Sequence, residues 1–228
     1  MYSKNRLLII DADGTTIDAF AAIEQTFAAH NMKIGDLDRF QKRRHIFKYL
    51  GGLKEFPNNL SRQLGKEKRS KLIRTLTDVY REEAKLYPGT ADWIDELLSA
   101  PGVHVGFVTR NITNEPLATL RQLLSRHGVD AKRLDFLLHV DLKRDKTMTF
   151  REVRKEFSIN PALAYACGDE KKDYQAALST GMHPFIASYG FEDYERLISK
   201  KVGVPQELIS RTPEELHQRV SHALLGER

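Results

Sequence analysis

Two carboxylates stand two residues apart near the start of the chain, directly after an apolar run. The run extends from Arg6 to Ile10, and the carboxylates are Asp11 and Asp13. Gly14 follows and allows a tight turn, and Thr15 supplies a hydroxyl. Carboxylates that follow a buried strand can bind a metal ion, attack an electrophile or transfer protons.

A second acidic pair follows a later apolar run that ends at Cys167. Asp169 and Asp173 are separated by four residues, which is about one helical turn. Like charges that converge in one cleft repel each other, so four such carboxylates are costly unless a cation lies among them. Oxygen ligands at this density favour Mg²⁺, and we expect these carboxylates to bind it.

Between the two acidic pairs, hydroxyl and cationic groups occur at positions that suit a phosphoryl group. Thr109, Arg110 and Asn111 end another apolar run and offer a hydroxyl and backbone N–H groups. Either Lys143 or Lys146 could compensate negative charge near a nucleophile and a phosphate. A purely structural metal site does not explain these residues.

The elements that must hold these side chains alternate between strand-like and helix-like patterns. Strands separated by helices of this length need crossover connections, which predicts an α/β fold with a doubly wound, mainly parallel sheet. The polar residues above would then gather at the carboxyl ends of the strands. We expect strands at 6–10, 103–109, 136–140, 162–167 and 184–187, helices at about 90–98, 115–127, 147–157 and 174–180, and a last helix from Pro213.

Residues 17 to 86 show apolar positions at helical spacing and no convincing strand. Phe20, Ile23 and Phe27 follow this spacing, as do Leu76 and Tyr80. The segment therefore predicts an all-helical block of about seventy residues.

Composition excludes several classes of protein. The 228 residues carry 36 Lys and Arg against 31 Asp and Glu, a net charge of +5 that does not by itself indicate a nucleic-acid partner. No apolar run approaches the roughly 20 residues that span a bilayer, and the N-terminus lacks a signal-peptide core, so we expect a cytoplasmic protein without a membrane partner. Cys167 is the only cysteine, and the eight histidines are scattered, which argues against a zinc site.

These residues together resemble the haloacid-dehalogenase superfamily, in particular its phosphoglycolate-phosphatase-like members. The resemblance spans nearly the whole chain, and four motifs occur in the family's order. Two lysines remain candidates for the third motif, because Lys146 suits the start of a helix whereas Lys143 fits the pattern Lys-x-Asp. The motifs are Asp11-Ala12-Asp13-Gly14-Thr15, then Thr109, then Lys143 or Lys146, and finally Gly168-Asp169-Glu170-Lys171-Lys172-Asp173.

The resemblance also implies a domain organisation. A helical (C1-type) cap would be inserted after the first motif, at 17–86, and residues 1–16 and 87–228 would form the core. Basic cap residues could recognise a second anionic group on the substrate, although a solvated helix face would look the same in the sequence. These residues are Lys42, Arg43, Arg44, His45, Lys54 and Arg62.

The family resemblance implies a role for each motif residue in a magnesium-dependent phosphatase. Asp11 would attack phosphorus and form an aspartyl-phosphate, while Asp13 would protonate the leaving oxygen and later activate water. Phosphoryl oxygens would be held by Thr109 with Lys143 or Lys146, and by Gly14, Thr15, Arg110 and Asn111. Mg²⁺ would bind Asp11, the Asp13 backbone carbonyl and Asp169, with Asp173 helping through water or by orienting the lysine.

The expected substrate is a small anionic phosphorylated metabolite, and no nucleic-acid partner is expected. The resemblance implies that an acid at the position of Asp13 is typical of enzymes that act on phosphate esters, whereas dehalogenases lack it. A phosphotransferase or mutase of the family would also have this acid. A non-catalytic binding module of the same fold is the alternative from another class, and its clustered acids would then have no use. The sequence leaves open whether the protein is a monomer or a homodimer.

Overall fold

The computed structural model describes residues 2–32, 50 and 69–226, and these form an α/β fold around one sheet. The sheet has six strands in the order β3-β2-β1-β4-β5-β6, and every neighbouring pair is parallel. This is the doubly wound sheet that the sequence predicts. The strands are β1 (Arg6–Ile10), β2 (Val103–Thr109), β3 (Phe136–His139), β4 (Ala164–Gly168), β5 (His183–Ala187) and β6 (Ile209–Ser210).

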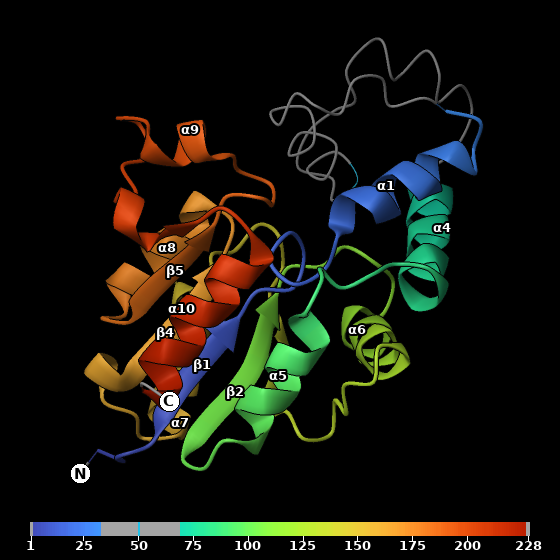
Figure 1. Cartoon of the computed structure of the whole chain (residues 1–228). Helices are drawn as coiled ribbons and strands as arrows, with labels where there is room; N and C mark the ends of the chain where they lie inside the picture. Colours follow the sequence, from blue (N-terminus) through green and yellow to red (C-terminus); the bar gives the residue numbers. More distant parts are fainter. Residues whose placement is uncertain (1, 33–49, 51–68, 227–228) are drawn as a thin grey trace.

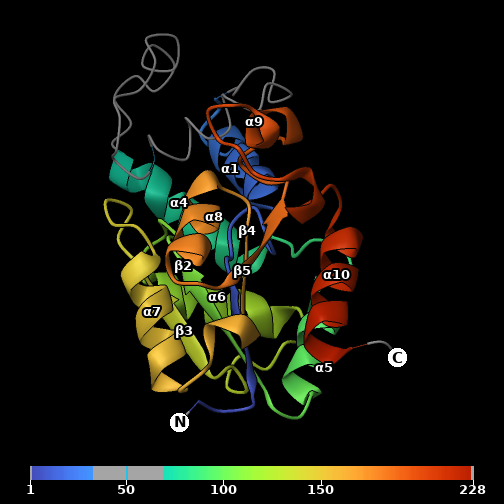
Figure 2. The same cartoon turned by 90° about the vertical axis from the view of Figure 1, so that its left-hand side faces the viewer.

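Helices cover both faces of this sheet. Figure 2 shows α5 and α10 against one face, with α7 and α8 against the other. The described helices are α1 (Ala19–Ala28), α4 (Arg69–Glu82), α5 (Thr90–Ser99), α6 (Pro116–Arg126), α7 (Thr147–Glu156), α8 (Lys171–Ser179), α9 (Tyr194–Ile198) and α10 (Pro213–Leu225).

The central strand β1 is buried on both faces because its apolar side chains alternate between two cores. Leu8 and Ile10 pack in the larger core, which contains residues of α5, α6 and α10. Leu7 and Ile9 pack in the core beneath α7 and α8. A strand covered on both faces has a continuous apolar sequence, which is why the run before Asp11 could be recognised from the sequence.

The chain reverses its winding direction between β1 and β4, which are neighbours in the sheet. In an open parallel sheet, the crevice beyond the carboxyl ends of such strands is the usual place for a ligand. Figure 1 shows α1 and α4 beyond this edge of the sheet. The fold therefore directs the residues after β1, β2 and β4 toward one region.

Most predicted elements are confirmed, with differences at the ends. The fourth strand begins at Ala164 rather than at Ala162, because the Asn160 side chain caps a short 3₁₀ turn from Pro161. The helix expected from about residue 174 begins earlier, because Glu170 and Asp173 form a reciprocal capping box. Helix α9 and the two-residue strand β6 were not predicted, because both are too short to give a periodic pattern.

The helical block expected at 17–86 is described only in part. Helices α1 and α4 lie in this range and confirm helical structure there. The division into a core and a cap at residues 16/17 and 86/87 stays a prediction. Among the described residues, no helix is long and apolar enough to cross a membrane. The basic residues that could recognise the substrate lie outside the described residues: Lys42, Arg43, Arg44, His45, Lys54 and Arg62.

Candidate active site

Asp11 lies at the carboxyl end of β1 with its two side-chain oxygens held by different donors. The backbone N–H of Ala12 donates to Oδ1 at 2.8 Å, and the Lys146 ammonium lies 2.7 Å from Oδ2. Lys146 also donates to Oδ1 of Asp173 at 2.8 Å. One buried lysine therefore links the first acidic pair to the second.

The structure separates the two candidate lysines clearly. Lys146 is the N-cap residue directly before α7, and only 2% of it is exposed. Lys143 lies three residues earlier in the preceding turn, where its side chain is exposed and its backbone N–H donates to Asp141. Lys146 is thus the lysine that the fold brings to Asp11, and we assign it to the third motif as a proposal.

Asp11, Asp169 and Asp173 form a buried group whose chemistry fits a divalent cation. Each offers one carboxylate oxygen, and these oxygens lie within 4.8 Å of one another. All ligands are hard oxygens, the set that Mg²⁺ prefers. Within the described part of the chain, four carboxylates and two cationic side chains meet here, which sum to two negative charges when all six are ionised. They are Asp11, Asp169, Glu170 and Asp173 with Lys146 and Arg110.

The raised pKa values of this group follow mainly from the burial of its carboxylates. Burial raises the pKa of Asp11 to about 7, although the Lys146 ammonium opposes the rise. Burial also raises the pKa of Asp169 well above its usual value, and the Asp11 carboxylate adds to the rise. A bound cation would favour the ionised forms of both groups, so the donor set fits a metal site.

The Asp13 carboxylate points to a different set of partners. Tyr80 of α4 donates its hydroxyl to Oδ1 at 2.7 Å, and the Asn111 amide donates to Oδ1 and Oδ2 at 3.0 and 3.1 Å. Burial raises the pKa of Asp13, and these hydrogen bonds oppose the rise. The side chain is therefore occupied by neutral donors, which suits proton transfer better than metal ligation.

The remaining predicted phosphate contacts are buried near the two acidic pairs. Thr109 is fully buried, and its hydroxyl oxygen accepts the backbone N–H of Asn111 at 3.0 Å. Thr15 donates its hydroxyl to Oδ1 of Asp169 at 3.4 Å. The Arg110 guanidinium is buried and pairs with Glu170. The Asn111 amide donates to Asp13, and the predicted contact of Asn111 with phosphate stays a prediction.

The loop after β5 packs against the same site, although none of the motifs in the sequence includes it. The backbone N–H of Phe191 donates to Oδ2 of Asp169. A Cβ atom at Gly190 would lie 2.2 Å from that oxygen and 2.3 Å from the carbonyl oxygen of Gly14. Gly14 itself has a φ of +80° in the turn that carries Asp13. The close approach of two backbones to Asp169 therefore requires glycine at 190.

We predict that Gly190→Ala weakens magnesium activation by about tenfold or more, because the added methyl group must displace Asp169 or the Gly14 backbone. The measurement is the Mg²⁺ concentration that gives half-maximal turnover, together with the rise in melting temperature on adding Mg²⁺. Gly203→Ala is the control, since nothing lies within 4 Å of its Cβ position, although its φ is +72°. It should lose about 1 kcal/mol of stability and keep normal magnesium dependence. Equal magnesium dependence in both variants would contradict the prediction.

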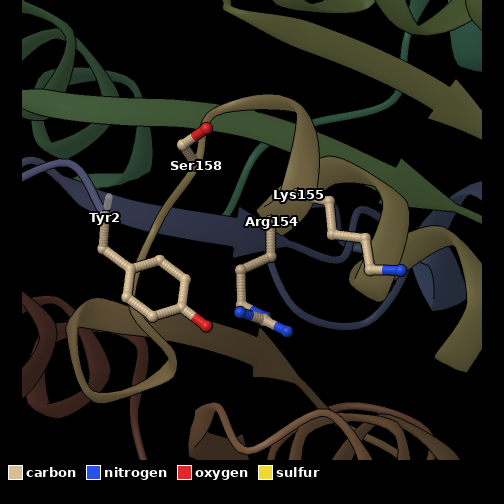
Figure 3. Close-up of a pocket in the computed structure, with 4 residues that line it drawn as sticks. All are labelled: Tyr2, Arg154, Lys155 and Ser158. Atoms are coloured by element: carbon tan, nitrogen blue, oxygen red, sulfur yellow. The ribbon is translucent and has the colours of Figure 1, made fainter.

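A separate surface groove of about 320 Å³ lies away from this site. It is lined by Tyr2, Arg154, Lys155 and Ser158, and Figure 3 shows the Lys155 ammonium turned away from the Tyr2 ring. Tyr2 precedes β1, so the groove lies near the amino ends of the strands. Arg154 and Lys155 lie in the last turn of α7, where positive charges interact favourably with the helix dipole.

The fold and the acidic residues at its carboxyl edge define the class of protein. Residues 8–187 match the family model described as haloacid dehalogenase-like hydrolase. The chain therefore belongs to the haloacid dehalogenase-like hydrolase family. This confirms the resemblance that the four motifs indicate.

Curated relatives and solved structures agree with this assignment. A phosphoglycolate phosphatase from Vibrio vulnificus (strain CMCP6) is 22% identical over 208 residues, covering 86% of this chain and 89% of the relative. A predicted phosphoglycolate phosphatase from Haemophilus somnus 129pt has a TM-score of 0.65 at 15% identity, covering 96% and 99% of the two chains. A haloacid dehalogenase-like family protein from Streptococcus pneumoniae has a TM-score of 0.62 at 18% identity, covering 95% and 98%. At these identities the solved structures establish the fold alone.

Proposed function

We propose that this hydrolase is a magnesium-dependent phosphatase that cleaves a small anionic phosphorylated metabolite. The observation that carries the proposal is the contact of Asp11 with Lys146, beside Asp169 and Asp173. A carboxylate held next to a buried lysine and a metal-type oxygen cluster can approach an anionic phosphate, because the cations offset the repulsion. The phosphoglycolate phosphatase relatives support a phosphate ester as the substrate class.

In the first half of the reaction, an Asp11 oxygen forms a bond to phosphorus while the bond from phosphorus to the leaving oxygen breaks. Asp13 gives its proton to that oxygen, which departs as an alcohol and leaves an aspartyl-phosphate. In the second half, the Asp13 carboxylate takes a proton from water as the water oxygen bonds to phosphorus. The bond between Asp11 and phosphorus then breaks, which releases phosphate and restores both carboxyl groups.

Other side chains would hold the phosphoryl group and the metal. Lys146, Thr109 and the backbone N–H groups near Arg110 offer cationic and hydrogen-bonding contacts for phosphoryl oxygens. Mg²⁺, when bound, would neutralise phosphoryl charge. Asp11, Asp169 and the Asp13 backbone carbonyl would hold it, with Asp173 acting through water or through Lys146. We further propose a cytoplasmic protein with no nucleic-acid partner.

The proposal predicts magnesium-dependent release of phosphate from p-nitrophenyl phosphate. Removing divalent cations with EDTA should lower the rate at least about a hundredfold, and added Mg²⁺ should restore it. Ca²⁺ provides a control, because its larger, more flexible coordination shell should support turnover less well. Turnover that persists unchanged in EDTA would contradict the metal role. If the folded, magnesium-loaded protein hydrolyses neither this ester nor any of a panel of phosphorylated metabolites, the phosphatase proposal fails.

A further inference from the structure

Tyr80 of helix α4 donates a hydrogen bond to Asp13, the proposed general acid. Tyr80 lies on α4, is 1% exposed, and donates to Oδ1 of Asp13 at 2.7 Å. A buried tyrosine hydroxyl needs a hydrogen-bond partner, and here the partner is a carboxyl group with a proposed role in the reaction. Burial and the nearby Asp13 carboxylate raise the pKa of the Tyr80 phenol well above its usual value, so the hydroxyl stays a donor.

The helix that carries this hydroxyl is fixed against α6 and the loop before it. The Arg81 guanidinium donates to Glu115 at 3.0 Å and to the Thr119 hydroxyl at 3.1 Å. The backbone N–H of Asn114 donates to the Thr77 hydroxyl at 2.8 Å. These contacts come from the residues of α4 that flank the tyrosine, so its hydroxyl has a defined position relative to the core.

The second donor to Asp13 is held by the same loop. Thr113 donates its backbone N–H to the Asn111 side-chain oxygen at 2.9 Å, and its hydroxyl donates to that oxygen as well. This orientation turns the Asn111 amide toward Asp13. As a result, Oδ1 of Asp13 accepts hydrogen bonds from both side chains, whereas among the described residues Oδ2 accepts only from the amide, at 3.1 Å.

We propose that Tyr80 is a positioning residue that fixes the Asp13 carboxyl group so that Oδ2 carries the transferred proton. With Oδ1 occupied by the phenol and the amide, Oδ2 is the oxygen with greater capacity for a proton and for a leaving oxygen or water. Tyr80 donates to a side-chain oxygen of Asp13, whereas the proposed metal ligand is the Asp13 backbone carbonyl, so Tyr80 would act on the reaction through the Asp13 carboxyl group. The inference rests on the proposed phosphatase function and adds a residue of α4 to it.

The test compares two phosphate esters whose hydrolysis depends to different degrees on proton donation by Asp13. Departing p-nitrophenolate is stable without protonation, whereas phenolate from phenyl phosphate is more basic and depends more on the proton from Asp13. Tyr80→Phe keeps the buried ring and removes only the hydroxyl. It should lower kcat/KM for phenyl phosphate about tenfold or more and that for p-nitrophenyl phosphate about threefold or less. Because kcat/KM covers the steps through first phosphoryl transfer, slow hydrolysis of the aspartyl-phosphate does not mask the difference.

Tyr189→Phe is the matched control, since it removes a hydroxyl that donates to the Thr15 backbone carbonyl at 3.0 Å and not to Asp13. Any loss in this variant should be equal for the two esters. Equal losses in Tyr80→Phe, or none, would overturn the inference while leaving the phosphatase proposal standing. If the intact protein hydrolyses neither ester nor any phosphorylated metabolite, both are overturned. Circular dichroism and the melting temperature establish that each variant is folded.

Discussion

Asp11→Asn is expected to lower the release of phosphate from p-nitrophenyl phosphate by at least about ten-thousandfold. An amide is a very poor nucleophile, and the substitution also removes one negative ligand from the metal-type cluster. The change is nearly isosteric, and the Ala12 N–H can still donate to the side-chain oxygen. The variant should therefore fold, which its melting temperature would verify.

Asp13→Asn removes the proposed general acid and base while it keeps the proposed nucleophile, Asp11. Turnover should fall about a hundred- to ten-thousandfold, because the asparagine cannot activate water for the second half of the reaction. Asp11 remains intact in this variant. Brief reaction followed by acid quenching and intact-mass analysis should then detect protein with one added phosphoryl group. No such species should form in Asp11→Asn, and an equal yield from both variants would rule out Asp11 as the nucleophile.

The fold could be predicted because parallel strands covered on both faces are continuous apolar runs. The run before Asp11 and the run ending at Cys167 both became neighbouring strands of the sheet. Their parallel pairing brings the residues after them to one edge, which is why the acidic pairs could be expected to meet. The short α9 and β6 escaped prediction because a few residues cannot establish a period.

Several features of the site depend on distances that no spacing in the sequence encodes. Tyr80 continues the apolar face of a helix, so its pattern indicates packing and gives no sign that its hydroxyl reaches Asp13. Gly190 follows a predicted strand as an ordinary loop residue, and only the approach of Gly14 and Asp169 explains why it lacks a side chain. The sequence offers such residues no signal beyond their type.

The choice between the two candidate lysines, Lys143 and Lys146, also depended on the three-dimensional structure of the segment before α7. Both occupy the polar segment before α7, and either spacing was compatible with a lysine near phosphate. The turn that begins at Asp141 leaves Lys143 exposed and brings Lys146 into contact with Asp11 and Asp173. This difference allows a matched pair of substitutions.

Lys146→Met should lower turnover about a hundred- to thousandfold, because the methionine keeps the volume of the side chain and removes its charge. The loss of the ammonium also leaves Asp11 and Asp173 without a cation that lies 2.7 and 2.8 Å from them. In the absence of metal, the free energy of unfolding should fall by about 3–5 kcal/mol. Urea unfolding in EDTA measures this loss, and steady-state kinetics at saturating Mg²⁺ measures the rate.

The same substitution at Lys143 tests whether position, rather than loss of a positive charge, causes these effects. Lys143 is exposed, so Lys143→Met should change the free energy of unfolding by less than about 0.5 kcal/mol and the rate by less than about twofold. Added Mg²⁺ should recover part of the stability lost in Lys146→Met, because a cation bound to the carboxylates replaces some of the missing charge. Loss of turnover in the Lys143 variant with normal turnover in the Lys146 variant would reverse the assignment of the third motif.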